Sequence, residues 1–295
     1  MARTLSRVSH AVSRKLIKPI PKNVRKTLLR VVRYTTLLAW ILVAAFPLYW
    51  MGLSSFRNPT VFSNPDPQLL PSLSELTFVN WEILQSTDVF QLMLNTFVVA
   101  VGVVALVVFI STTAGYGLTR LDFPFKLTFA RVVLFGYMIA PIVLAIPMYI
   151  IYSTLGLLNT YIGIIIAHSV RATPFGVWLM WKMFQTVPTA KEEAAWMLGA
   201  SRVRSARDVA IPSVYPGILA VGVFAFATVW GDFTFARILL PDSDMMTLAP
   251  GLIQLAQEGA YLNTGHLMVI TSVMSIIPIF FAYRLQDTLL RGFRL

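Results

Sequence analysis

Six long runs of apolar residues constrain the possible folds of this chain more than any other feature of its sequence. The runs lie at Tyr34–Ser54, Leu92–Leu118, Ala130–Tyr152, Tyr161–Trp181, Gly217–Leu239 and Leu267–Leu289. Each has the length of roughly 20 residues that a helix needs to cross about 30 Å of hydrocarbon. They are too long and too uniformly apolar for barrel strands, and a helix satisfies its own backbone hydrogen bonds in lipid. We therefore predict an all-α membrane protein with six transmembrane helices.

The positions of lysine and arginine predict the orientation of these helices. The net charge of +11 could suggest a nucleic-acid partner, but 21 of the 24 basic residues fall at the ends of the chain and on alternate connections between the runs. The other side keeps only Arg57 and Arg237, together with seven of the 13 acidic residues. By the positive-inside rule, both termini lie in the cytoplasm, which an even number of spans allows. We expect a multi-pass protein of the cytoplasmic membrane, in contact with lipid, and no nucleic-acid partner.

Ten of the basic residues lie within positions 1–33. We predict that residues 1–33 form a basic cytoplasmic extension, largely disordered, which fixes the orientation of the first span. Contact with anionic lipid headgroups or with a partner protein is the alternative. Residues 34–295 then form the transmembrane domain.

The connections between the runs differ in expected structure. The outer connection Ser55–Phe90 is long and rich in proline and asparagine, which is typical of turns. The connection Ser153–Thr160 predicts a tight turn around Gly156 and Asn159. The cytoplasmic connection contains a segment, 188–212, that is bounded by prolines and rich in helix formers.

Segment 188–212 is predicted to begin with a short helix. Thr189 or a neighbour can cap it, and Glu192 and Glu193 lie in its first turn, where acids interact favourably with the helix dipole. Gly199 provides the left-handed conformation that ends a helix.

A second, cationic helix is expected from Arg202 to about Val209, with Pro212 as its stop. The two helices would form a compact knob with small residues on one side and a charged rim. Such a knob could bind a soluble partner, or it could lie on anionic lipid as an amphipathic hairpin. The residues alone leave both readings open.

The segment contains Glu193-Ala194-Ala195, then three residues, Gly199, nine residues, and Val209-x-Ile211-Pro212. This spacing resembles the EAA loop of ABC importer permeases, with Val209 and Ile211 in place of the usual Ile and Leu. Further matches fit the carbohydrate subfamily, in particular the six-helix maltose-type permease, and they cover about Leu37 to Leu289. They are Val79-Asn80-Trp81, Asn95-Thr96, Tyr116 to Arg120 with Phe123-Pro124 and Lys126, Pro141, Ile146-Pro147-Met148-Tyr149, Leu155-Gly156-Leu157 with Asn159-Thr160, and Trp230-Gly231-Asp232-Phe233.

The resemblance implies the type I ABC importer permease fold, also called MetI-like, with a cytoplasmic EAA coupling helix. It implies a second homologous permease subunit, an ATPase dimer and an external substrate-binding protein as partners. Glu193 would be the charged contact to the ATPase, Ala194 and Ala195 the close-packing surface, and Gly199 the bend. The full set of implied coupling residues is Glu192, Glu193, Ala194, Ala195, Gly199, Val209, Ile211 and Pro212.

The resemblance also implies the function: half of the translocation path for a carbohydrate, or for a related solute such as glycerol phosphate. The sequence contains no Gly-x-x-x-x-Gly-Lys-Ser/Thr phosphate loop, so ATP hydrolysis is expected in partner subunits and the chain is not predicted to be an enzyme. The sequence contains no cysteine, and its three histidines lie far apart. We therefore predict neither a metal site nor a cofactor.

Polar residues within the apolar runs are candidates for the translocation path, because charge inside a membrane is costly. Arg171 lies near the middle of the fourth run, with His168 one turn before it. Arg171 could contact substrate, or it could pair with an acid or with carbonyls of a partner subunit. Asp232, near the outer end of the fifth run, could line the path or pair with Arg237 as a rim charge.

Two other functional classes compete with the importer. A polytopic membrane enzyme is less favoured, because no constellation of histidines and acids gathers at a membrane face. A secondary transporter would normally carry more buried ionisable residues for ion coupling.

Overall fold

The computed structural model describes residues 22–63, 75–85, 87–257 and 263–292. Within these residues the elements are helical, apart from one antiparallel bridge between Arg57 and Leu76. The chain divides into two compact units, Met1–Leu53 and Ser54–Leu295. The two are described separately.

The first unit is represented by helix α2 (Lys22–Ser55), whose last two residues belong to the second unit. The helix contains the predicted first span. It begins at Lys22, so the expectation of a disordered extension is wrong for residues 22–33, while residues 1–21 lie outside the described part. Leucine, lysine and arginine, all good helix formers, explain why the helix continues into the basic segment. At 34 residues it is about 50 Å long, which exceeds the hydrocarbon thickness of about 30 Å.

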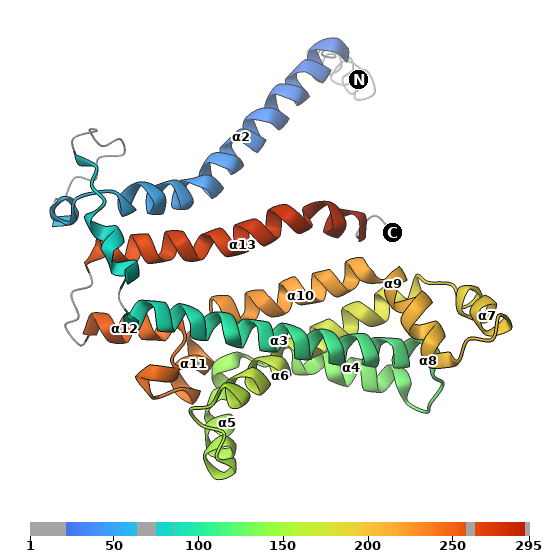
Figure 1. Cartoon of the computed structure of the whole chain (residues 1–295). Coiled ribbons are helices and arrows are strands. Elements are labelled where there is room, and N and C mark those ends of the chain that lie inside the picture. The colour runs from blue at the N-terminus through green and yellow to red at the C-terminus, as the bar shows by residue number, and fades with distance from the viewer. Residues whose placement is uncertain (1–21, 64–74, 86, 258–262, 293–295) are drawn as a thin grey trace, which may run out of the picture. The chain divides into compact units, whose positions relative to one another are not determined.

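Three helices form the core of the second unit: α3 (Thr87–Arg120), α6 (Tyr161–Gln185) and α10 (Tyr215–Trp230) (Figure 1). The contact between α3 and α6 is the most extensive in the molecule, and α10 packs against both. α13 (Thr264–Gly292) packs against α10. The side chains in this core are mostly small or β-branched, for example Ala100, Val103, Ala167 and Val221, and all four are buried. Small residues let helices approach closely in a membrane.

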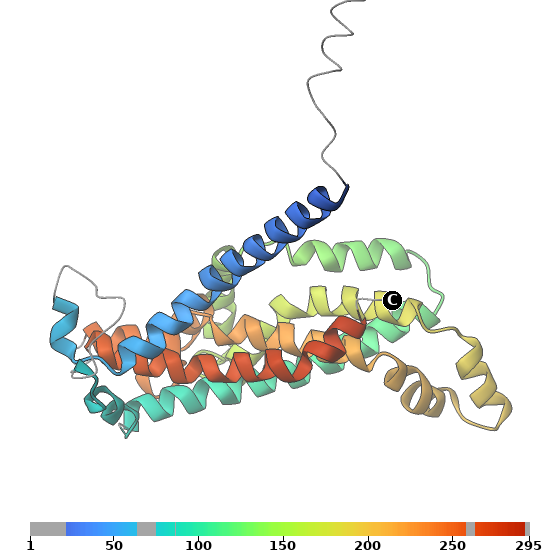
Figure 2. The ribbon, with the colours of Figure 1, turned by 90° about the horizontal axis from the view of Figure 1, so that it is seen from above.

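The predicted third span is broken in its middle. α4 (Lys126–Gly136) and α5 (Pro141–Leu155) meet at an angle of 94°, so the run 130–152 is sharply bent and is a single span only if the bent pair counts as one (Figures 1 and 2). Proline has no backbone N–H and disfavours helical geometry in the residue before it. Ala140 is accordingly extended, and Pro141 opens α5.

The predicted fifth span is also shorter than expected. α10 ends at Trp230, and after a three-residue break the chain forms α11 (Thr234–Leu239), η5 (Ser243–Met245) and α12 (Leu248–Gln257). Four helices in the described part are long and apolar enough to span a membrane. The number rises to six if the bent pairs α4–α5 and 202–213 with α10 each count as one span.

The short connection between α5 and α6 confirms the predicted tight turn. Gly156 and Asn159 both have positive φ, 67° and 53°. Thr160 caps α6 by accepting a hydrogen bond at its Oγ1 from the N–H of Gly163, at 3.0 Å. The long connection Ser55–Phe90 contains two 3₁₀ helices, η1 (Pro59–Ser63) and η3 (Val79–Gln85), and its residues 64–74 and 86 lie outside the described part.

Two glycines of α3 provide a matched test of its packing on α6. A Cβ at Gly115 would lie 2.7 Å from Met180 Cβ and 2.8 Å from the Trp181 backbone nitrogen, whereas a Cβ at Gly117 would meet only Leu121 Cδ1, at 3.7 Å. We expect Gly115→Ala to destabilise the protein by about 1–3 kcal/mol, because the backbone of α6 must move. Gly117→Ala should be neutral or stabilise by up to about 1 kcal/mol. Thermal unfolding midpoints of the purified protein in detergent measure both, and equal midpoints would contradict the assigned contact.

Candidate functional site

The segment that resembles an EAA loop folds as two short helices at one end of the second unit, remote from α11 and α12 (Figure 1). They are α7 (Ala190–Met197) and α8 (Arg202–Ser205). Gly199 between them has a φ of 90°, which confirms the predicted left-handed turn. Thr189 occupies the position before α7, but its side chain makes no capping hydrogen bond. Ser201, which the sequence analysis did not single out, caps α8 by accepting from the N–H of Arg204.

The second helix of the segment does not stop at Pro212. α8 continues through a π-helical turn, η4 (Ala206–Ala210), into α9 (Ile211–Ser213), and the sharp bend of 74° comes only before α10. In the π turn the N–H of Ile211 bonds to the carbonyl of Ala206, five residues earlier. Such a turn widens the helix just before a proline, which has no N–H to donate.

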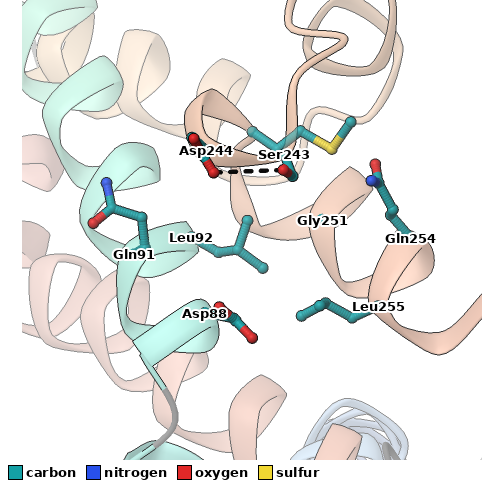
Figure 3. Close-up of a pocket in the computed structure, with 9 residues that line it drawn as sticks. Asp88, Gln91, Leu92, Ser243, Asp244, Gly251, Gln254 and Leu255 are labelled. Carbon is teal, nitrogen blue, oxygen red and sulfur yellow. Dashed lines mark hydrogen bonds between the residues drawn. The ribbon is translucent and has the colours of Figure 1, made fainter. Parts of the chain in front are cut away.

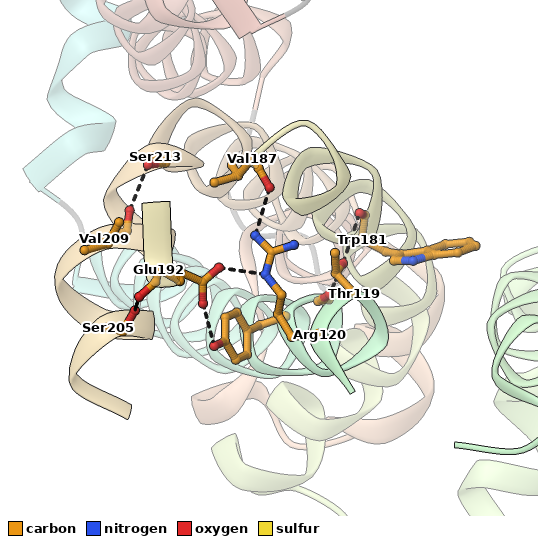
Figure 4. A network of polar contacts seen from close by, with 10 residues as sticks. Thr119, Arg120, Trp181, Val187, Glu192, Ser205, Val209 and Ser213 are labelled. Atoms are coloured by element: carbon orange, nitrogen blue, oxygen red, sulfur yellow. Dashed lines mark hydrogen bonds and ion pairs between the residues drawn. The ribbon is translucent and has the colours of Figure 1, made fainter. Parts of the chain in front are cut away.

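Glu192 lies inside the protein and forms the centre of a polar network (Figure 4). Its side chain is 1% exposed. Arg120, the last residue of α3, donates from Nε to Glu192 Oε1 at 2.6 Å and from Nη2 to the carbonyl of Val187 at 2.9 Å. Tyr116 donates its hydroxyl to Glu192 Oε2 at 2.8 Å, and the Ser205 hydroxyl donates to the Glu192 carbonyl at 3.3 Å. We call Arg120, Tyr116 and Glu192 the clasp.

The tip of the two helices is apolar and exposed. Met197, Leu198 and Val203 are 88%, 90% and 79% exposed. Glu193 and Ala194 are exposed on the same helix as Met197. A shallow cavity of about 290 Å³ adjoins the tip, and Ala195, Leu198, Gly199 and Val209 contribute to its lining. The acid that faces outward is therefore Glu193, while Glu192 faces inward.

At the opposite end of the unit, a second cavity of about 190 Å³ lies among the first turns of α3, η5 and α12 (Figure 3). Carboxylates, amides and a hydroxyl surround Leu92 at its centre. The polar lining residues are Asp88, Gln91, Ser243, Asp244 and Gln254. No motif marked this cavity in the sequence, because its walls come from segments about 150 residues apart.

Asn95 fixes the wall of this cavity, which we call the outer cavity because the sequence predicts this end of the unit on the outer side. Its Nδ2 donates to the carbonyls of Asp244 and Met246, both at 2.8 Å, and its Oδ1 accepts from the Tyr161 hydroxyl at 2.6 Å. The next residue, Thr96, accepts at Oγ1 from the N–H of Leu248 at 2.8 Å. The Asn95-Thr96 pair, noted in the sequence only as part of a resemblance, thus holds η5 and α12 on α3.

The three candidate path residues gather in one place. Asp232 lies in the break between α10 and α11, 3.7 Å from His168 Nε2 and 3.9 Å from Arg171 Nη1. Its Oδ2 also accepts from the N–H groups of Phe235 and Ala236, at 3.0 and 3.1 Å, and so caps α11. The side chains of His168 and Asp232 are buried, whereas that of Arg171 is 30% exposed.

This cluster bears on two pairings that the sequence left open. Arg171 pairs with an acid of its own chain, so its partner need not come from another subunit. Asp232 does not pair with Arg237, which donates instead to Gln254 Oε1 at 3.0 Å. Among the described residues, no group of three or more histidines and acids is arranged to hold a metal ion.

The two neighbouring acids of α7 should respond differently to substitution. Glu192→Ala would leave the Arg120 guanidinium, whose side chain is only 12% exposed, without its carboxylate, and we expect a loss of about 3 kcal/mol in the free energy of unfolding. Glu193→Ala removes an exposed side chain and should change it by no more than about 0.5 kcal/mol. Thermal unfolding of the purified variants tests this, and a smaller loss for Glu192→Ala than for Glu193→Ala would refute the buried position of Glu192.

Several known proteins are similar to this chain over most of its length. The inner membrane ABC transporter permease protein YcjP of Escherichia coli (strain K12) is 28% identical over 91% of this chain and 95% of the relative. The diacetylchitobiose uptake system permease protein NgcG of Streptomyces coelicolor is 26% identical over 85% of this chain and 83% of the relative. The sn-glycerol-3-phosphate transport system permease protein UgpE of Agrobacterium fabrum is 26% identical over 84% of this chain and 90% of the relative.

Solved structures share the fold. A chain of a bacterial ABC transporter involved in the import of the acidic polysaccharide alginate superposes with a TM-score of 0.75 and 22% identity, over 92% of this chain and 99% of the other. A chain of the alginate transporter in complex with an alginate pentasaccharide-bound periplasmic protein superposes with a TM-score of 0.59 and 13% identity, over 91% of this chain and 93% of the other. The predicted ABC importer permease fold is thereby confirmed.

The family described as "Binding-protein-dependent transport system inner membrane component" matches residues 108–295, which include α6, the clasp and both tip helices. This match covers more than half of the sequence, and several helices can span a membrane. The chain is therefore a multi-pass membrane protein and belongs to the family of binding-protein-dependent transport system inner membrane components.

Proposed function

We propose that this permease subunit is driven by a separate ATPase dimer that docks on the tip formed by α7 and α8. The observation that carries the proposal is the exposure of Met197, Leu198 and Val203 at the end of a rigidly held loop. Apolar side chains gathered on a projecting element mark an interaction surface rather than a solvated one. Glu193, exposed beside them, supplies a charge that can select the partner and its orientation.

In this proposal ATP-driven closure of the ATPase dimer displaces α7, and the attached helices rock between two arrangements. One arrangement opens the path to the external binding protein, and the other opens it to the cytoplasm. The ATPase can bias the two states only through contacts that differ between them. The tip and both chain termini would lie on the cytoplasmic side, and the outer cavity of Asp88 and Asp244 on the other.

One chain of this size supplies only part of a path wall, and a second, homologous permease would supply the rest. A carbohydrate is the favoured solute. One relative is named as a permease of a diacetylchitobiose uptake system, and the fold is shared with a transporter involved in the import of alginate. Within this chain, Arg171, Asp232 and His168 form a charged cluster among the core helices, with Arg171 the most accessible of them. Arg171 could donate hydrogen bonds to sugar hydroxyls from its free face.

Glycerol phosphate is the second candidate solute. A relative named as an sn-glycerol-3-phosphate permease favours it, and so does Arg171, whose side chain is 30% exposed, because guanidinium binds phosphate in a bidentate fashion. Transport assays separate the two solutes as described below.

Docking is tested with one exposed apolar residue on the tip and one outside it. Leu198→Asp places a charge in the proposed interface and should abolish co-purification of the ATPase, or weaken it by at least about 10-fold, a cost of about 1.4 kcal/mol. Phe125→Asp, at a residue 82% exposed in the α3–α4 connection, is the matched control and should leave co-purification unchanged. Retention of the ATPase by Leu198→Asp would overturn the proposed docking surface.

The solute is tested by ATP-dependent uptake into proteoliposomes that contain the assembled transporter and its binding protein. We expect uptake of labelled oligosaccharides such as diacetylchitobiose, and a fall of about 10-fold in Arg171→Gln, because each lost hydrogen bond from a charged donor costs about 1.5–3 kcal/mol. Uptake of sn-glycerol 3-phosphate in preference to every sugar tested would favour the second candidate. Uptake of sugar without ATP would reject the ATP-driven importer.

A further inference from the structure

We infer that the clasp is the joint through which a displacement of α7 reaches α3, a helix that is not connected to the coupling loop in the sequence. The inference rests on the proposed ATPase docking and extends it from the tip to a second membrane helix.

The covalent connections of the loop lead elsewhere. α7 follows α6 in the chain, and α8 continues through η4 and α9 into α10. Without a lateral contact, a displacement of α7 would act directly on α6 and α10 alone. α3 ends at Arg120, 72 residues before Glu192, and reaches α7 only through side chains.

The clasp has the properties of a stiff joint. One carboxylate receives Arg120 on one oxygen, at 2.6 Å, and the Tyr116 hydroxyl on the other, at 2.8 Å. The same guanidinium holds the carbonyl of Val187, so the connection between α6 and α7 is fixed as well. Charge-assisted hydrogen bonds away from water are short, directional and little screened. Such a contact keeps its geometry when α7 moves, so the movement of α7 is passed on to α3.

Another ion pair on the same loop shows the contrast. Arg204 and Asp208 are 3.5 Å apart, their side chains are 74% and 55% exposed, and they lie four residues apart in one continuous helical segment. This pair joins no separate elements and is open to solvent. It provides a matched control for the loss of a charge.

α3 is suited to carry a displacement along its length as one continuous helix. It contains no proline, whereas α2, α5, α6 and α13 each have one in their interior. Asn95 and Thr96, about 38 Å from Arg120 along the helix axis, hold η5 and α12 by buried hydrogen bonds. A displacement received at Arg120 therefore arrives at the wall of the outer cavity without passing through a kink.

The test follows α3 and α8 separately during nucleotide binding. The sequence has no cysteine, so introduced cysteines are the only labelling sites on this chain. Leu121 just after α3 and Tyr283 in α13 are 55% and 69% exposed, and Arg207 in η4, which continues α8, is exposed and is not part of the tip. Spin labels are placed in pairs, Leu121→Cys with Tyr283→Cys and Arg207→Cys with Tyr283→Cys. Electron–electron distances are then measured in the assembled transporter with and without ATP.

In the otherwise native chain we expect ATP to change both distances. In Glu192→Gln, which keeps the shape of the side chain but removes its charge, the Arg207 distance should still change and the Leu121 distance should change much less, because α3 then follows only through its packing on α6 and α10. Solute transported per ATP hydrolysed should fall about 10-fold in this variant, within the usual range of coupling between sites. Asp208→Asn should behave as the native chain does.

Equal movement of Leu121 in Glu192→Gln and in the native chain would overturn the inference. If neither distance changes with ATP in the native chain, the proposed ATPase docking fails, and the inference fails with it. Tyr116→Phe, which removes one hydrogen bond and leaves the ion pair, serves if Glu192→Gln does not fold. An intermediate movement of Leu121 is then expected, and full movement counts against the joint.

Discussion

The second unit depends on the close contact between α3 and α6. Hydrophobicity does not drive helices together in lipid, so they associate through packing and hydrogen bonds between them. Gly115 lies against the backbone of α6, and Gly176 of α6 lies against Ser111 of α3. Because the backbones are so near, side chains at both ends of the pair reach across. Tyr161 bonds Asn95 at one end, and Arg120 bonds the carbonyl of Val187 at the other.

The two adjacent acids of the coupling loop face different sides of α7 and have different roles. Consecutive residues of a helix point about 100° apart, so one of them can face the protein while the next faces outward. Glu192 enters the clasp and Glu193 remains on the surface. The loop is thus held firmly on its inner side, and its outer side is available to a partner. From the sequence, Glu193 was expected to contact the ATPase and Glu192 was counted only among the coupling residues, since spacing along the chain does not show which acid faces inward when the position of α3 is unknown.

The sequence was sufficient wherever structure follows from local chemistry. Hydropathy predicted where the spans lie, because a segment in lipid is apolar and satisfies its own backbone hydrogen bonds by forming a helix. Glycine and asparagine marked the left-handed turns at Gly156, Asn159 and Gly199. The break after Trp230 was not predicted, and Pro141 indicated a kink but not its angle of 94°, since an apolar run has the same hydropathy whether it is straight or bent. The π turn before Pro212 was missed for a related reason, because a proline can be accommodated as well as stop a helix.

Contacts between residues far apart in the chain do not follow from such local sequence patterns. Arg120 and Glu192 are 72 residues apart, and Arg171 and Asp232 approach only because the chain breaks after α10. Each of the three path candidates is recognisable in the sequence, since a polar residue within an apolar run is conspicuous. That they lie together does not follow from the sequence, because it depends on how α6 and α10 are placed side by side.

The early end of α10 has a consequence for the surrounding bilayer. Its 16 residues measure about 24 Å, several ångströms less than a hydrocarbon layer of about 30 Å. A membrane adapts to a short helix by thinning around it, at a modest cost per ångström. Headgroups and water would then approach the exposed part of Arg171, although this residue lies within a hydrophobic run, while Asp232 stays buried beside it.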